Sequence, residues 1–207
     1  MFDQQIISAI ASAAAAMSLW EVAAVILALA YLVLAMQEKI SCWYAAFGST
    51  LIYTFLFWDV SLLMESALQV FYLVMAVYGW WQWQHRNENG ETLEINVWPL
   101  RTHLLVLAGV GILTLGFGYL LQSTTDAALP YLDSFTTWGA VVTTYMVTRK
   151  VLENWIYWLV IDAVSIYLYL DRELYLTALL FVFYVVLVVF GFIRWHASYR
   201  QGQAVPA

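Results

Sequence analysis

The chain has 207 residues, of which 64% are hydrophobic and only 11% are charged, and its formal net charge is −6. A soluble domain has roughly 45–50% apolar and about 25% charged residues. This composition therefore excludes a soluble domain and, with the long apolar segments described below, predicts an all-α integral membrane protein. The single cysteine, Cys42, excludes an intramolecular disulfide and a thiolate metal cluster. The three histidines lie apart in the sequence, and there is no basic patch for a nucleic acid. No metal, cofactor or nucleic-acid partner is therefore expected.

Residues 1–17 precede the first long apolar segment. Asp3 stands where a secretory signal would carry Lys or Arg, and the Ala-rich stretch Ile6–Met17 is too short to span a bilayer. These residues are predicted to form an interfacial helix or a flexible N-terminal segment.

Seven apolar segments follow, each near the ~20 residues that a tilted helix needs to cross the hydrocarbon core. The connections between them are short except for the polar loop Arg86–Trp98, and Pro99 after this loop suits the first turn of a helix. The sequence thus predicts seven transmembrane helices, at Trp20–Met36, Cys42–Trp58, Ser66–Trp83, Leu104–Leu121, Phe135–Thr148, Trp155–Leu170 and Leu174–Ile193.

The basic residues fall almost entirely on one side of these seven predicted helices. Of the eight, only Arg172 lies on the other side. Because Lys and Arg are enriched in cytoplasmic loops, the N-terminus is predicted to lie outside and the C-terminus in the cytoplasm. The residues on the predicted cytoplasmic side are Lys39, Arg86, Arg101, Arg149, Lys150, Arg194 and Arg200.

An internal repeat emerges when the sequence is shifted by 112 residues. Trp43–Trp83 and Trp155–Trp195 then share 12 of 41 residues, and the matches include Asp, Gly and Trp as well as aliphatic residues. Chance would give roughly one match in ten for so biased a composition. The shift predicts a first three-helix repeat at 18–86, a loop and linker helix at 87–122, a second three-helix repeat at 131–198 and a C-terminal tail at 199–207.

The shift moves the first three helices by four spans. Because four is an even number, the two repeats are predicted to run in the same direction across the membrane. Parallel repeats of this kind are typical of transporters, in which the substrate binds near the membrane midplane between the repeats.

The sixth apolar segment carries a polar face. Asn154, Trp158, Asp162 and Ser165 recur at helical spacing, so they lie on one side of the predicted helix. A carboxylate at this depth is costly and normally points into a bundle interior or a wet cavity. The face is therefore interpreted as the wall of a binding site. The alternative is that Asp162 only forms a hydrogen bond with a neighbouring helix.

The third predicted helix ends in an aromatic stretch, YGWWQWQH. Tyr72, Trp80 and Trp83 fall on one face, and Gln82 adds an amide. Indoles bind flat or cationic groups by stacking and cation–π attraction, worth ~0.5–2 kcal/mol each. Tryptophans near a helix end can instead form the aromatic belt at the membrane interface. We predict ligand contacts for Trp80 and Trp83, and the belt position for Trp81.

The Trp80-x-x-Trp83 motif and the Asn154, Trp158, Asp162 face resemble the two signatures of the PnuC nicotinamide riboside transporters. The seven-span layout and the linker helix extend the resemblance over most of the chain. It implies a 3+1+3 fold similar to that of the SWEET sugar transporters, a homotrimer in the bacterial inner membrane, and uptake of nicotinamide riboside, an NAD precursor, by facilitated diffusion. The candidate substrate-binding residues are Tyr72, Trp80, Gln82, Trp83, Asn154, Trp158, Asp162 and Ser165.

Other functions remain open at this point. Relatives with this fold carry thiamine or riboflavin, and a membrane receptor that does not transport would use the same pocket. An enzyme would need a nucleophile–base set, metal ligands or a phosphate-binding loop. The sequence shows none of these, so no catalytic residues are expected.

Overall fold

The structure is a computed structural model that describes residues 2–59, 63–85, 92–125 and 129–204. Within these ranges the chain is helical, apart from short connections, the non-helical segment 92–99 and the bridge between Asn96 and Val151. The prediction of an all-helical chain is thus confirmed. The helices are α1 (Phe2–Ala16), α2 (Leu19–Met36), α3 (Cys42–Asp59), α4 (Leu63–Gln84), α5 (Leu100–Thr124), α6 (Pro130–Thr148), α7 (Asn154–Asp171) and α8 (Tyr175–Ala204).

Helices α2 to α7 each contain one of the predicted apolar segments, and α8 contains all of the seventh except Leu174. Three of the described helices, α2, α5 and α8, are long and apolar enough to cross a membrane by length and composition. Helix α8 runs 11 residues past the predicted end at Ile193, because the polar residues that follow continue the helix. Arg86, the loop residues 87–91 and residues 205–207 of the predicted tail lie outside the described ranges.

Local sequence signals fix several helix ends. Ser18 accepts a hydrogen bond from the N–H of Glu21, whose side chain accepts one from the N–H of Ser18, so a capping box begins α2. Pro99 is the N-cap of α5, one residue before the position predicted for it. Pro130 occupies the first turn of α6, where its missing N–H is not needed.

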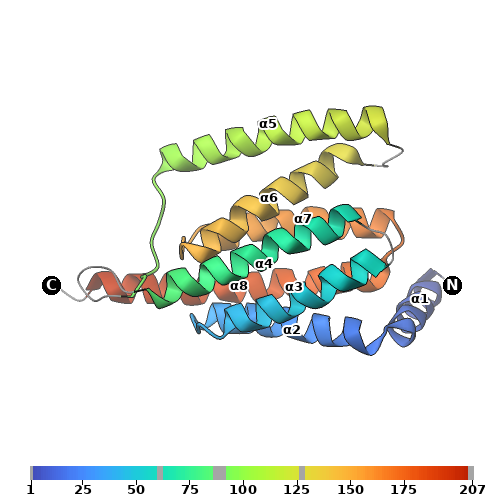
Figure 1. The fold of residues 1–207 in the computed structure, drawn as a ribbon, viewed down its shortest axis with the longest axis horizontal. Coiled ribbons are helices and arrows are strands. Elements are labelled where there is room, and N and C mark those ends of the chain that lie inside the picture. Colours follow the sequence, from blue (N-terminus) through green and yellow to red (C-terminus); the bar gives the residue numbers. More distant parts are fainter. Residues whose placement is uncertain (1, 60–62, 86–91, 126–128, 205–207) are drawn as a thin grey trace.

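The helices pack as two similar groups of three (Figure 1). Helix α3 contacts α2 and α4, and α7 contacts α6 and α8 in the same way. The two groups meet through α2 against α8 and through α4 against α6. Under the 112-residue shift these two contacts are equivalent, because α2 corresponds to α6 and α4 to α8. Helix α5 lies apart from the bundle along α6, as Figure 1 shows.

Equivalent tight turns follow α2 and α6. Glu38 and Lys150 both adopt left-handed backbone conformations, with φ angles of 54° and 50°. Each donates its N–H to an equivalent carbonyl, Glu38 to Ala35 and Lys150 to Val147, at 3.0 Å. Residues in this conformation commonly end helices by satisfying the last free carbonyls. The sequence repeat is therefore also a repeat of backbone geometry.

Two glycines allow equivalent helix contacts. A Cβ at Gly79 would collide with the ring of Trp43, and a Cβ at Gly191 would collide with the ring of Trp155. Both tryptophans are 2% exposed. The matched Gly and Trp residues of the repeat therefore let α4 approach α3, and α8 approach α7, more closely than any side chain would permit.

Replacing Gly79 with Ala should destabilise the protein by about 1–3 kcal/mol, because the added methyl group overpacks the Trp43 contact. Thermal unfolding of the purified protein in detergent measures the effect. Gly109→Ala is the matched control, since a Cβ there meets nothing within 4 Å. Equal melting temperatures for the two variants would contradict this account of the α3–α4 contact.

Candidate functional site

Four buried tryptophans meet where the two groups of helices join. Trp83 packs edge-on against Trp43 with ring centroids 5.3 Å apart, and Trp195 packs edge-on against Trp155 at 5.3 Å. Trp83 and Trp195 lie 6.1 Å apart and connect the two pairs. We call these four residues the tryptophan cluster. It lies at the end of the bundle where α2 and α6 end and where α3 and α7 begin.

Reciprocal hydrogen bonds join the repeats at the tryptophan cluster. Trp83 donates its indole N–H to the carbonyl of Val147 at 3.3 Å, and Trp195 donates its own to the carbonyl of Ala35 at 3.0 Å. The two donors are equivalent under the 112-residue shift, and so are the two acceptors. Trp83 was predicted to contact a ligand. In the structure its N–H and much of its ring join one repeat to the other.

Trp80 and Gln82 lie at the same end of α4 as Trp83 of this cluster. Trp80 packs against the core and donates its indole N–H to the Tyr44 hydroxyl at 3.0 Å. Gln82 donates to the Tyr78 hydroxyl at 2.6 Å. Trp158 of α7 also packs against the core. The structure therefore gathers the tryptophans predicted on α4 and α7 around one hydrophobic core.

Asn154 is the first residue of α7 and is fully buried. Its side-chain NH₂ donates to the Val151 carbonyl at 2.7 Å. Its side-chain oxygen is also buried and accepts no hydrogen bond from the described part of the chain. A buried acceptor without a donor costs free energy. Asn154 can therefore accept a hydrogen bond from a bound solute.

Asp162 and Ser165 lie deeper on the same face of α7. Their exposed fractions are 4% and 6%. Between residues that the structure describes, no hydrogen bond or ion pair reaches the Asp162 carboxylate. An ionised carboxylate without a partner is expensive in such a place. A cationic ligand or a proton would relieve this cost.

Tyrosines from several helices interact electrostatically with Asp162 or with one another. Tyr169 and Tyr184 lie within electrostatic range of its carboxylate. Tyr53 of α3 and Tyr72 of α4 lie within electrostatic range of Tyr169. Tyrosines of the first repeat are therefore connected electrostatically to Asp162 through Tyr169.

Of these tyrosines only Tyr72 was a sequence candidate. Two signals could have identified others. Tyr184 is the equivalent of Tyr72 under the 112-residue shift, and Tyr169 follows Asp162 by two helical turns on the same face. Tyr53 is the equivalent of the candidate Ser165 under the same shift, so the repeat could have identified it as well.

The predicted residues thus form two levels along the bundle. Trp80, Gln82, Trp83, Asn154 and Trp158 lie near the tryptophan cluster. Asp162 follows Asn154 by eight residues, or about 12 Å along a helix, and Ser165 and Tyr72 share this deeper level. Within the described residues no group of three or more metal-ligating side chains occurs. The arrangement suits binding of a polar or cationic solute between aromatic rings.

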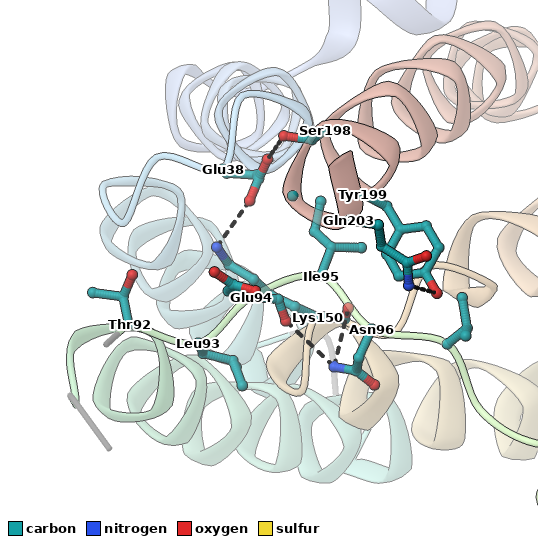
Figure 2. Close-up of a pocket in the computed structure, with 12 residues that line it drawn as sticks. Glu38, Thr92, Leu93, Glu94, Ile95, Asn96, Lys150, Ser198, Tyr199 and Gln203 are labelled. Carbon is teal, nitrogen blue, oxygen red and sulfur yellow. Dashed lines mark hydrogen bonds and ion pairs between the residues drawn. The ribbon is translucent and has the colours of Figure 1, made fainter. Parts of the chain in front are cut away.

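A cavity of about 550 Å³ lies elsewhere, beyond the tryptophan cluster (Figure 2). Glu38, Lys150, Asn96 and Ser198 line it together with other residues of 92–97 and of the end of α8. None of the eight sequence candidates is among its lining residues. It is therefore separate from the polar face of α7.

Apolar helices around a buried polar face define an all-helical membrane protein. The comparison with known proteins gives the family: the chain belongs to the nicotinamide mononucleotide transporter family, whose model matches residues 18–197. The protein is thus a member of a family of membrane transporters. The resemblance noted at Trp80, Trp83, Asn154 and Asp162 is confirmed at the level of the family.

Individual relatives agree with this assignment. The chain is 25% identical over 193 residues to the nicotinamide riboside transporter PnuC of Escherichia coli K12, covering 81% of each chain. It is also 25% identical over 181 residues to the riboflavin/roseoflavin transporter RibM of Streptomyces davaonensis, covering 85% of this chain and 84% of the relative. The crystal structure of the vitamin B3 transporter PnuC shares its fold, with a TM-score of 0.73, 21% identity, and coverage of 95% of this chain and 90% of that one.

Replacing Trp83 with Phe should lower the stability of the ligand-free protein by about 1–2 kcal/mol, because a buried hydrogen bond between the repeats is lost. The equivalent Trp195→Phe variant should behave in the same way. Thermal unfolding without ligand measures both. Trp81→Phe is the control, since that side chain is 44% exposed. If Trp83→Phe melted like the control, the indole would have no structural role.

Proposed function

We propose that the protein carries nicotinamide riboside across the bacterial inner membrane by facilitated diffusion. The observation that carries this proposal is the buried Asp162 carboxylate, which has no partner in the described part of the chain and interacts electrostatically with Tyr169 and Tyr184. Nicotinamide riboside is a flat pyridinium cation with a carboxamide and ribose hydroxyls, so it offers a positive charge to Asp162 and a hydrogen-bond donor to the side-chain oxygen of Asn154. The relative named as a nicotinamide riboside transporter supports this choice.

Each polar residue of the proposed site has one part in binding. Asp162 supplies the counter-charge to the pyridinium, and an ion pair gains strength in a site that excludes water. Asn154 accepts a hydrogen bond from the carboxamide or a ribose hydroxyl through its free side-chain oxygen. Ser165 and Gln82 offer further hydroxyl and amide groups.

The aromatic residues of the proposed site contribute contact area. Trp80, Trp158 and Tyr72 stack on or flank the ring of the ligand and interact with its positive charge. Trp83 forms the closed end of the site, because its N–H is already donated to Val147.

We further propose that helices α2 to α8 all span the membrane in a 3+1+3 arrangement, with α5 as the linker. The N-terminus lies outside and the C-terminus in the cytoplasm. The equivalent contacts of the two repeats support this arrangement. Three such chains form a homotrimer, for which the exposed apolar side chains of α5 offer a surface: Leu104, Leu105, Leu107, Ile112 and Leu115.

Riboflavin is the second candidate substrate. The relative named as a riboflavin/roseoflavin transporter is as similar to this chain as the nicotinamide riboside transporter, at 25% identity. Thiamine, another flat cation, would also suit Asp162. The charge of the solute separates riboflavin from the two cations, because riboflavin is neutral and would form no ion pair with the carboxylate.

Uptake into proteoliposomes tests the proposal directly. Labelled nicotinamide riboside should enter down its own gradient without a proton gradient, and unlabelled riboflavin and thiamine should compete weakly. Uptake of riboflavin or thiamine without uptake of nicotinamide riboside would replace the proposed substrate. Binding of nicotinamide riboside without any uptake would instead indicate a receptor.

Replacing Asp162 with Asn should weaken nicotinamide riboside binding by about 10–100-fold, because a charge-assisted interaction of ~1.5–3 kcal/mol is lost. Calorimetric titration of the purified protein measures the dissociation constant. Glu173→Gln is the matched control, since it neutralises an exposed acid just beyond α7 and should leave binding unchanged. Equal losses in the two variants, or none in either, would remove Asp162 from the site.

A further inference from the structure

Glu38 and Lys150 occupy equivalent positions of the two repeats and form an ion pair with each other. They are 112 residues apart, and Lys150 Nζ lies 3.0 Å from Glu38 Oε2. The pseudo-twofold relation between the repeats places the two tight turns face to face. Because one turn carries an acid and the other a base, the equivalent residues attract each other across the boundary between the repeats.

Further contacts hold this pair in position. Ser198 of α8 donates a hydrogen bond to the other oxygen of Glu38 at 2.7 Å. Lys150 Nζ also lies 4.8 Å from the centroid of the Trp83 ring, a cation–π distance. Figure 2 shows Glu38 between Ser198 and Lys150. The ion pair therefore links both turns to α8 and to the tryptophan cluster.

Residues 92–97 support the turn that carries Lys150. Asn96 donates its N–H to the Lys150 carbonyl at 3.0 Å and accepts from the N–H of Leu152 at 2.8 Å. Its side-chain amide donates to the Arg149 carbonyl at 2.7 Å. These hydrogen bonds hold the backbone of Lys150 in place. The ion pair can therefore break when the turn that carries Glu38 moves, or when the two side chains change conformation.

Polar contacts between the repeats gather at this end of the bundle. Over the described ranges, the side-chain hydrogen bonds and ion pairs that join one repeat to the other are Trp83–Val147, Trp195–Ala35, Lys150–Glu38 and Ser198–Glu38. At the opposite end, the ion pair of Arg172 and Asp133 joins α6 to the end of α7, within the second repeat.

The ion pair differs from the tryptophan contacts in its access to water. It lines the cavity of about 550 Å³, and the side chains of Lys150 and Glu38 are 11% and 27% exposed. Water that enters the cavity can solvate both charges once they separate. Among the contacts that join the repeats, we therefore expect the Lys150–Glu38 ion pair to break first when the bundle opens at this end.

We propose that Glu38, Lys150 and Ser198 form a latch that keeps the tryptophan-cluster end of the bundle closed, and that the latch opens during each transport cycle. This inference rests on the proposed function, because a carrier with parallel repeats must open each end in turn. The latch residues do not touch the substrate. They position the two repeats relative to each other.

The single cysteine provides a reporter for opening at this end. Cys42 is fully buried four residues after Glu38, and it belongs to the same hydrophobic core as Trp43 and Val147. A maleimide can react with it only when the repeats separate there. Lys150 lies within electrostatic range of the thiol, and a nearby cation favours the reactive thiolate. Removing the Lys150 charge would by itself slow the reaction of the thiol. A faster reaction in a Lys150 variant therefore indicates that Cys42 has become exposed.

The experiment measures the rate of N-ethylmaleimide attachment to Cys42 by mass spectrometry, in proteoliposomes without substrate. Glu38→Gln and Lys150→Gln should each react at least fivefold faster than the unmodified chain. Ser198→Ala, a milder change, should react about twofold faster. The charge-swapped E38K/K150E double variant should return to within twofold of the original rate, because the ion pair is restored with reversed charges.

Asp133→Asn is the control, since it breaks an ion pair inside one repeat at the other end and should leave the rate unchanged. An impermeant maleimide should label the Gln variants from one side of the membrane only, whereas a loosened fold would react from both. The latch proposal would be wrong if both Gln variants reacted with maleimide at the rate of the unmodified chain, or if the double variant reacted as fast as the single variants. The assay needs no substrate, so failed uptake of nicotinamide riboside would count against the proposed function and not against the latch.

Discussion

The structure depends on the reciprocal pair of hydrogen bonds from Trp83 to Val147 and from Trp195 to Ala35. Each bond satisfies a buried indole N–H with a carbonyl near the end of a helix in the other repeat, so neither repeat can complete its own core. Gly79 supports this arrangement by letting α3 and α4 approach closely. The pseudo-twofold relation between the repeats follows from these contacts.

The symmetric scaffold carries an asymmetric set of polar groups. Asp162 and Asn154 of the second repeat correspond to Thr50 and Cys42 of the first. Thr50 donates its hydroxyl to a carbonyl of its own helix at 2.8 Å, whereas Asp162 has no partner in the part of the chain described. A solute with one charged end can therefore bind in one orientation. The turns after α2 and α6 are likewise equivalent in backbone but opposite in charge, because one carries Glu38 and the other Lys150.

Much of the fold was predictable because the relevant signals are local. Apolar segment length located α2 to α8, and the helices that the 112-residue shift pairs make equivalent contacts. The polar face of α7 was also visible, since Asn154, Asp162 and Ser165 follow helical spacing and are all buried. The role of Trp83 was not predictable in this way. A tryptophan near a helix end can bind a ligand, join a membrane interface or fill a core, and the choice depends on which carbonyl faces it.

The sequence by itself therefore determined the class of protein, the positions of the helices, the repeat and the residues that share one helix face. These properties depend on composition and spacing along a single segment. Only the tertiary structure decided that Trp83 joins the repeats, that Lys150 meets Glu38, and that Tyr184 of α8 interacts electrostatically with Asp162. The hydrogen-bonded partners that join the repeats lie 64 to 160 residues apart in the sequence. Whether these residues come into contact depends on how the helices pack, and local sequence patterns do not predict helix packing.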